Sequence, residues 1–102
     1  MEATREIARA KINGETAQLS WGDLALFFAR GIVIHVAPQL DLVEVALTFS
    51  EDDKSSVNQW MQAGQVGKLD DAVAADWAKR NPELWAVVVA PWVLVQERGK
   101  PH

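Results

Sequence analysis

Apolar residues in the first third of the chain recur at the spacing of amphipathic helices. A short helix over residues 3–12 is predicted to bury Ile7 and Ala10, and Gly14 is expected to end it. A second helix is predicted between the cap residue Ser20 and the stop residue Gly31. Its core-facing side chains recur at i, i+3, i+4 and i+7, and they are Trp21, Leu24, Ala25 and Phe28.

Three later segments have the apolar pattern of β-strands. Residues 32–36 are rich in β-branched side chains, and residues 42–49 alternate between apolar and mixed positions. The two segments flank a turn at Pro38, which predicts an antiparallel hairpin. Residues 85–95 are apolar at both parities, so this central strand is expected to be covered on both faces. Pro91 within it indicates either a sheet edge or a bend.

Acidic residues mark the predicted starts of two further helices. Ser50 is expected to cap a helix that ends near Ala63, and Asp70 a helix over residues 71–79. The predicted element order is therefore ααββααβ. This order predicts an α+β fold in which a small antiparallel three-stranded sheet packs with about four helices. Residues 1–102 are expected to form a single domain, with its core at about 4–96 and a flexible polar tail at 97–102.

Composition narrows the classes of protein to which the chain can belong. It has 102 residues, 49% of them hydrophobic, with five tryptophans and no cysteine. Disulfide frameworks, thiolate catalysis and cysteine-based metal sites are thereby excluded, and a reducing cytoplasm is favoured. The longest apolar run, at 85–95, is shorter than the roughly 20 residues of a membrane span. With a net charge of −4 and scattered lysines and arginines, neither membrane nor nucleic acid is expected as a partner.

Several segments resemble a bacterial family catalogued as domain of unknown function 2288. The resemblance is carried by Leu40-Asp-Leu-Val-Glu-Val-Ala46, Ser50-Glu-Asp52 and Trp85-Ala-Val-Val-Val-Ala-Pro-Trp-Val-Leu-Val-Gln96. The segment 17–28 with its tryptophan is similar as well, so the resemblance covers about residues 11–96. It implies a stand-alone bacterial protein, and it brings with it no activity, cofactor or catalytic residue.

One polar cluster could carry chemistry if the predicted hairpin forms. Pairing around the turn would make His35 and Glu44 cross-strand neighbours, with Asp41 close by. A histidine beside a carboxylate can act as a general base or as half of a metal site. The alternative is a surface polar pair, with Asp41 serving the turn through its side chain.

The acidic run at residues 51–53 is the second candidate. Clustered carboxylates can hold Mg²⁺ or Ca²⁺, but the favourable field of a helix N-terminus explains these acids without a ligand. No phosphate-binding loop, nucleophile motif or zinc-binding helix motif occurs in the sequence. We therefore expect no metal and no cofactor.

Trp85 and Trp92 are the candidate interface residues. They have opposite parity on the predicted last strand, so they are expected to point to opposite sides, one into the core and one towards a pocket or partner. The alternative is that helices of this chain cover both faces of the strand. The function predicted first is a non-catalytic interaction module for an unidentified protein partner, and a homodimer through the C-terminal strand is one form that this prediction includes. The alternative is a small-molecule-binding protein or enzyme that uses His35 with Glu44.

Overall fold

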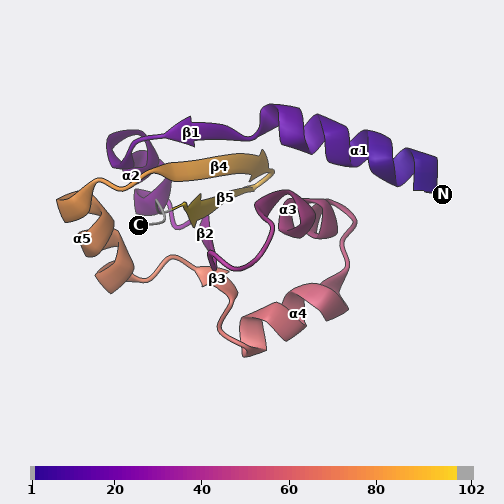
Figure 1. Cartoon of the computed structure of the whole chain (residues 1–102). Helices are drawn as coiled ribbons and strands as arrows, with labels where there is room; N and C mark the ends of the chain where they lie inside the picture. Colours follow the sequence, from indigo (N-terminus) through magenta and orange to yellow (C-terminus); the bar gives the residue numbers. More distant parts are fainter. Residues whose placement is uncertain (1, 99–102) are drawn as a thin grey trace.

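The structure is a computed structural model that describes residues 2–98. These residues form five helices and five strands, which confirms the α+β class (Figure 1). The helices are α1 (Glu2–Glu15), α2 (Trp21–Ala29), α3 (Leu42–Ser50), α4 (Lys54–Gln62) and α5 (Asp71–Arg80). The strands are β1 (Ala17–Leu19), β2 (Val33–Val36), β3 (Val66–Lys68), β4 (Leu84–Val89) and β5 (Trp92–Glu97).

All five strands belong to one mixed sheet, in the order β1-β4-β5-β2-β3. The pair β2 and β5 is parallel, and the other three neighbouring pairs are antiparallel. Strand β5 lies at the centre, and each edge strand is only three residues long. The predicted three-stranded antiparallel sheet is therefore wrong in strand number and in direction.

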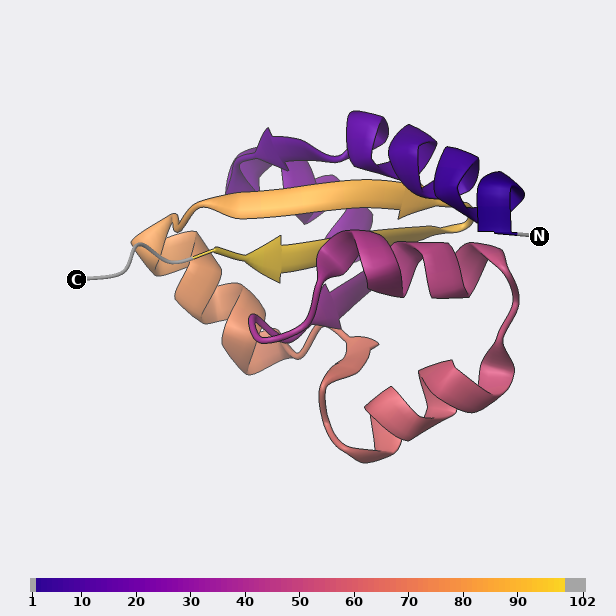
Figure 2. The same cartoon turned by 45° about the vertical axis from the view of Figure 1, so that its right-hand side comes forward.

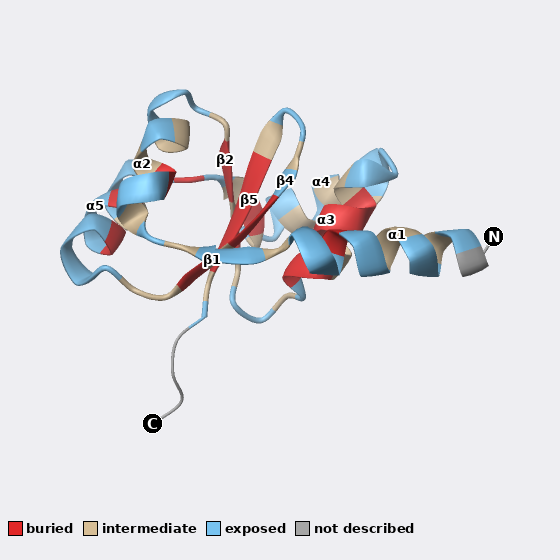
Figure 3. Cartoon of the chain, turned by 90° about the horizontal axis from the view of Figure 1, so that it is seen from above, coloured by how far each residue is buried: buried red, intermediate tan, exposed pale blue. Residues whose placement is uncertain are grey.

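Helices cover both faces of the sheet. Helices α2 and α5 lie on one face, and α1, α3 and α4 lie on the other (Figure 3). Each face buries its own apolar core. The core under α3 contains Ile12, Ile34, Val36, Leu42, Val43, Val45, Ala46, Leu47, Val66, Val87 and Leu94. The core under α2 and α5 contains Leu24, Val33, Leu69, Ala74, Trp77, Leu84, Ala86, Val93 and Val95.

Residues 42–49, predicted as a strand, belong to helix α3. The Asp41 carboxylate caps this helix by accepting hydrogen bonds from the backbone N–H of Val43 at 3.0 Å and of Glu44 at 3.3 Å. The helix is buried on most of its sides, so it has apolar residues at nearly every position and no clear helical stripe. The order of apolar and polar residues in this segment therefore fitted a strand as well as a helix. Because the segment is a helix, the hairpin predicted around Pro38 does not form.

Residues 85–95, predicted as one strand, contain a β-hairpin. Strand β4 ends at Val89, the chain turns at Ala90 and Pro91, and β5 returns so that Val89 pairs with Trp92. The prediction that both faces are covered holds for most of this segment, because the sheet has helices on both sides. Paired residues on antiparallel strands point to the same face. Trp85 and Trp92 therefore lie on the same face, under α3, and not on opposite faces as predicted.

Several predicted helix boundaries also change. Helix α1 continues through Gly14, and its exposed side carries Ile7, which is 71% exposed instead of buried. Ser50 is the last residue of α3 and caps nothing; the N-cap of α4 is Asp53. The caps Ser20 and Asp70 are confirmed. The edge strands β1 and β3 lie in segments for which no strand was predicted from the sequence.

The first two residues of the predicted tail at 97–102 are part of the fold. Glu97 is the last residue of β5, and the backbone N–H of Arg98 donates to the Glu83 carbonyl at 3.1 Å. The rest of that prediction falls outside the described residues. Among residues 2–98, no helix combines the length and the apolarity that crossing a membrane requires.

Candidate functional site

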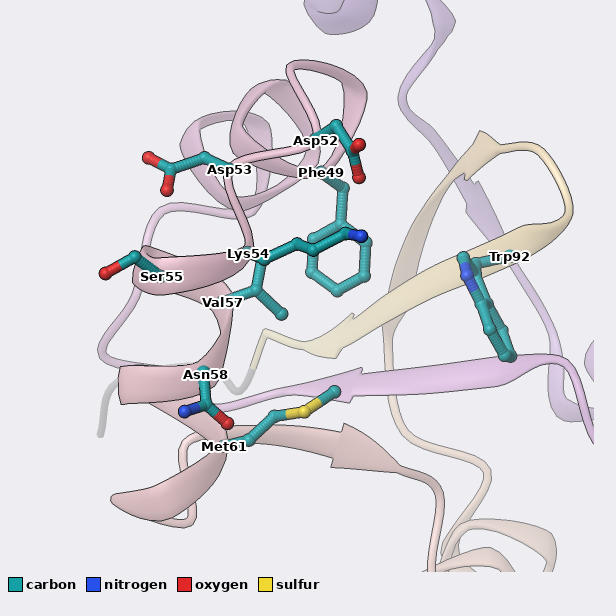
Figure 4. Close-up of a pocket in the computed structure, with 9 residues that line it drawn as sticks. All are labelled: Phe49, Asp52, Asp53, Lys54, Ser55, Val57, Asn58, Met61 and Trp92. Atoms are coloured by element: carbon teal, nitrogen blue, oxygen red, sulfur yellow. The ribbon is translucent and has the colours of Figure 1, made fainter.

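A hollow of about 560 Å³ opens between helix α4 and the start of strand β5 (Figure 4). We call it the Trp92 groove. Its volume falls within the range of about 300–1,000 Å³ that is usual for ligand sites. Its lining residues are Phe49, Asp52, Asp53, Lys54, Ser55, Val57, Asn58, Met61 and Trp92.

Three local features of the chain shape this groove. Phe49 comes from the last turn of α3, and the chain then reverses through Asp52, whose φ of 58° lies in the left-handed region. Asp53 caps α4 by accepting the backbone N–H of Ser56 at 3.1 Å. On the opposite wall, Trp92 is the first residue after the β4–β5 turn. The groove thus joins parts of the chain that are about 40 residues apart.

Helix α4 forms one wall and is held to the body less tightly than α3. It has no buried residue, whereas α3 has six. Trp60 packs in part against the core, and Met61 is 44% exposed and borders the groove (Figure 4). An element with little buried surface can move outward at low cost, so this wall can adjust to an occupant.

Two lysines bring positive charge close to the aromatic side chains. The Lys54 ammonium extends from α4 towards Phe49 (Figure 4). The Lys68 ammonium lies 5.7 Å from the centre of the Trp92 ring, within cation–π range. Among residues 2–98, neither lysine has a carboxylate within ion-pair distance, whereas Arg5, Arg9 and Arg80 all do.

The two acidic residues of the groove differ in their surroundings. The Asp53 carboxylate accepts the Ser56 backbone N–H and the Ser56 hydroxyl, and these hydrogen bonds hold the pKa of Asp53 below its usual value. The Asp52 carboxylate lies at the upper rim, above the Lys54 ammonium in Figure 4. Asp52 therefore opposes the positive charge of the lysines at the mouth of the groove.

Trp85, the other candidate interface residue, does not line the groove. Its indole N–H donates to the Glu83 carboxylate at 2.9 Å, and the Arg98 guanidinium lies 4.9 Å from the centre of its ring. Its ring packs in part against the core under α3. Both tryptophans are half-buried and pack in part against this core, but only Trp92 borders the groove.

The structure does not bring His35, Asp41 and Glu44 together. Asp41 caps α3 through its carboxylate. Glu44 lies on α3 and forms ion pairs with Arg9 and Arg5, which hold the pKa of its carboxyl below the usual value.

His35 belongs to the opposite face of the sheet from Glu44. Its ring packs edge-on against Trp77 of α5, with ring centres 5.1 Å apart. Burial lowers the pKa of His35, because the charged imidazolium loses water, and the charge of Glu97 opposes this shift. The pair His35 and Glu44 that was predicted from a hairpin therefore has no shared space.

A polar cluster beside His35 was not predicted from the sequence. The Glu97 carboxylate accepts the Trp77 indole N–H at 3.0 Å and two N–H groups of Arg80, which also binds Asp76. These contacts lower the pKa values of Glu97 and Asp76. The spacing of Asp76 and Arg80 by four residues is visible in the sequence, but the role of Glu97 required knowledge of the strand pairing.

The acidic run at residues 51–53 does not form a cation site. Glu51 pairs with Arg5 at 2.8 Å, Asp52 lies at the groove rim, and Asp53 caps α4. Across residues 2–98, no three histidine, aspartate or glutamate side chains are grouped so that they could hold a metal ion.

Comparison with known proteins places the chain in a family. No protein with a curated description matches it. It is 48% identical to PA1075 from Pseudomonas aeruginosa, whose NMR solution structure matches with a TM-score of 0.81 over 92% of this chain and 87% of that chain. The model of the family described as protein of unknown function (DUF2288) matches residues 7–97. The chain therefore belongs to the DUF2288 family, which confirms the resemblance found in the sequence.

Proposed function

We propose that this chain is a non-catalytic interaction module and that the Trp92 groove receives an apolar side chain of a partner protein. The observation that carries the proposal is the open hollow lined by Phe49, Met61 and Trp92. Aromatic residues at an accessible hollow are the usual anchors of protein interfaces. The adjustable wall formed by α4 supports the same interpretation.

The polar side chains elsewhere in the fold support a binding role over a catalytic one. The carboxylates of Asp41 and Asp70 are engaged as helix caps, and those of Glu44 and Glu97 as partners of arginine. The alternative function, catalysis or ligand binding by His35 with Glu44, needs two converging side chains. They lie on opposite faces of the sheet, so this alternative has no geometric support.

The charges around the groove favour an acidic partner segment. Lys54 and Lys68 have no carboxylate partner among residues 2–98, and both lie close to the aromatic side chains of the site. An acidic residue next to the docked apolar side chain would pair with one of them. Complementary charges of this kind select the partner and orient it.

A fluorescence titration with 8-anilinonaphthalene-1-sulfonate tests the groove, because this probe combines a flat apolar body with an anionic group. We expect saturable binding to the folded chain. Trp92→Leu should weaken it about tenfold, since an aromatic anchor is lost. Lys54→Gln should weaken it about threefold through loss of one charge at the rim. Asp52→Asn should strengthen it, because a repulsive carboxylate is removed at a position where asparagine tolerates positive φ.

Matched controls separate the groove from the rest of the surface. Trp21→Leu changes a half-buried tryptophan on the other face of the sheet, and Lys79→Gln changes an exposed lysine on α5. Both variants should bind the probe as the parent chain does. Equal binding by Trp92→Leu and the parent chain, with native circular dichroism, would show that the groove is not the site.

We also propose a bacterial cytoplasmic location for the protein, and we keep a homodimer as one form of the interaction. The dimer was expected through the C-terminal strand, but β5 is paired on both sides, so a second copy would need another surface. Sedimentation equilibrium decides between a second copy and a different protein as the partner. The absence of cysteine and the relative in Pseudomonas aeruginosa support the location.

A further inference from the structure

Helix α2 is strongly apolar and yet largely uncovered. Seven of its nine residues are apolar, but only Leu24 is buried. The helix lies behind the sheet in Figure 2, on the face opposite α3 and the Trp92 groove. Phe27 and Phe28 pack in part against the core, whereas Leu26 is 73% exposed. A helix that is apolar on nearly all sides is normally covered on all sides, so the outward side of α2 lacks a cover.

The outward side of α2 is centred on Leu26. Successive residues of an α-helix turn by about 100°, so residues three and four positions apart lie on the same side. Along one edge of this side, Leu26 has Gly22 and Ala29 as neighbours. Along the other edge it has Asp23 and Arg30. All five residues are exposed, so this side can be reached by another molecule.

The two charged residues of this side have no partner within the described part of the chain. Among residues 2–98, neither Asp23 nor Arg30 has an opposite charge within ion-pair distance. Asp23 precedes Leu26 by three residues and Arg30 follows it by four. Each residue adds about 1.5 Å along the helix axis, so the two charges lie at nearly equal distances on either side of the exposed leucine.

We propose that two copies of this chain associate through α2, with the two helices antiparallel about a two-fold axis beside Leu26. Leu26 of each copy then packs against Leu26 of the other, and Asp23 of each copy faces Arg30 of the other. The small side chains of Gly22 and Ala29 let the two helix axes approach closely. A two-fold interface requires a surface that complements itself, and an acid and a base placed evenly around an apolar residue meet this requirement.

The order of the charges also fixes the direction of the pair. In a parallel pair, Asp23 would face Asp23 and Arg30 would face Arg30, and like charges that meet at an interface disfavour it. A single helix of nine residues gives a small interface, so we expect weak association with a dissociation constant on the order of 100 µM.

The proposed pair leaves the Trp92 groove of each copy open, because α2 and the groove lie on opposite faces of the sheet. The dimer therefore carries two grooves. A partner with two docking segments can then bind both grooves at once and more tightly than it binds a single copy.

Sedimentation equilibrium of the whole chain between about 10 µM and about 1 mM measures the association. We expect monomer at the low end of this range and dimer at the high end. Leu26→Ser should weaken association at least about tenfold, because each dimer loses two leucines from its centre. Ile7→Ser is the matched control and should associate as the parent chain does, because Ile7 is 71% exposed but lies on α1.

Two charge variants test the antiparallel pair. Asp23→Arg and Arg30→Asp, each studied alone, should weaken association about tenfold, because like charges then meet twice in each dimer. An equimolar mixture of the two variants should associate about as strongly as the parent chain, since one variant supplies both bases and the other both acids. Circular dichroism shows whether each variant keeps the native fold.

Three results would overturn the proposal. A monomer at every concentration up to about 1 mM would leave the surface of α2 to a different protein. Association of natively folded Leu26→Ser at the strength of the parent chain would assign the dimer to another surface. A mixture of the two charge variants that stays monomeric would exclude the pairing of Asp23 with Arg30. The Trp92 groove could still bind its probe in each case, because that binding is read at Trp92.

Discussion

Gln96 is a buried polar residue whose replacement should destabilise the fold by a definable amount. It lies on β5, is 3% exposed, and its side-chain amide donates to the carbonyls of Ala37 at 2.9 Å and Leu40 at 2.6 Å. These two carbonyls belong to the loop between β2 and α3. The amide therefore fixes the loop that places α3, and with it Phe49, beside the Trp92 groove.

The replacement Gln96→Met keeps the volume of the side chain and removes its donor. The Ala37 carbonyl still accepts the backbone N–H of Leu40 at 3.1 Å, so it loses one of its two hydrogen bonds and keeps the other. The Leu40 carbonyl is part-buried and loses the Gln96 donor, and loss of a hydrogen-bond partner costs an acceptor about 1–3 kcal/mol when it is buried. Together the two losses predict a destabilisation of about 2–3 kcal/mol, which lowers Tm by roughly 10–20 °C for a domain of this size.

Urea unfolding followed by circular dichroism measures this loss, with Gln59→Met on the exposed side of α4 as the control. The control should stay within about 0.5 kcal/mol of the parent chain. If Gln96→Met lost no more stability than the Gln59→Met control, the prediction would be wrong, because the Leu40 carbonyl would then not depend on Gln96.

Three further predictions test other parts of the structure. The lowered pKa of Glu44 in the folded state stabilises the fold above the usual carboxyl value of 4.5, and this contribution is lost as the pH falls through the folded pKa. Glu44→Gln should therefore lose less stability than the parent chain between about pH 5 and about pH 3, and equal losses in urea titrations would contradict the role of its ion pairs with Arg9 and Arg5. Val87 is 2% exposed and Val88 is 62% exposed, so Val87→Thr should cost about 2 kcal/mol and Val88→Thr less than about 0.5 kcal/mol. The reverse order in thermal unfolding would contradict the register of the β4–β5 hairpin. Asp41→Ala should cost about 1 kcal/mol while Asp41→Asn costs little, because asparagine also caps helices, and equal effects of the two on unfolding would argue against the cap.

The sequence predicted well where local chemistry alone decides the structure. Ser20 and Asp70 are followed by helical spacing, and both cap helices in the structure. Gly31 was predicted as a helix stop, and it adopts positive φ after α2, as Gly64 does after α4. Such signals depend on neighbouring residues and need no knowledge of the tertiary fold.

The prediction failed where burial removed the contrast between two faces. Helix α3 is covered on most sides, so its apolar residues lost the helical stripe and matched a strand. The hairpin turn at Ala90 and Pro91 lacks the glycine or asparagine that usually marks a tight turn, so two strands looked like one.

The candidate site was predicted only in part, because most of its residues come together only in the tertiary fold. Trp92 could be selected because one of the two tryptophans on the predicted last strand was expected to face a pocket or partner. Phe49, Lys54 and Met61 could not be joined to it, because they approach only after α3 and α4 pack beside the hairpin. The link between His35 and Glu44 depended on a hairpin that does not exist.

Chemical-shift mapping of the ¹⁵N-labelled chain with 8-anilinonaphthalene-1-sulfonate tests the proposed interaction site most directly. We expect the indole N–H of Trp92 and the amides of Lys54 and Met61 to shift together as the probe is added. The indole signals of Trp21, Trp77 and Trp85 should stay in place. Shifts centred on one of those three tryptophans, or no saturable shift at Trp92, would contradict the assignment of the groove as the binding site.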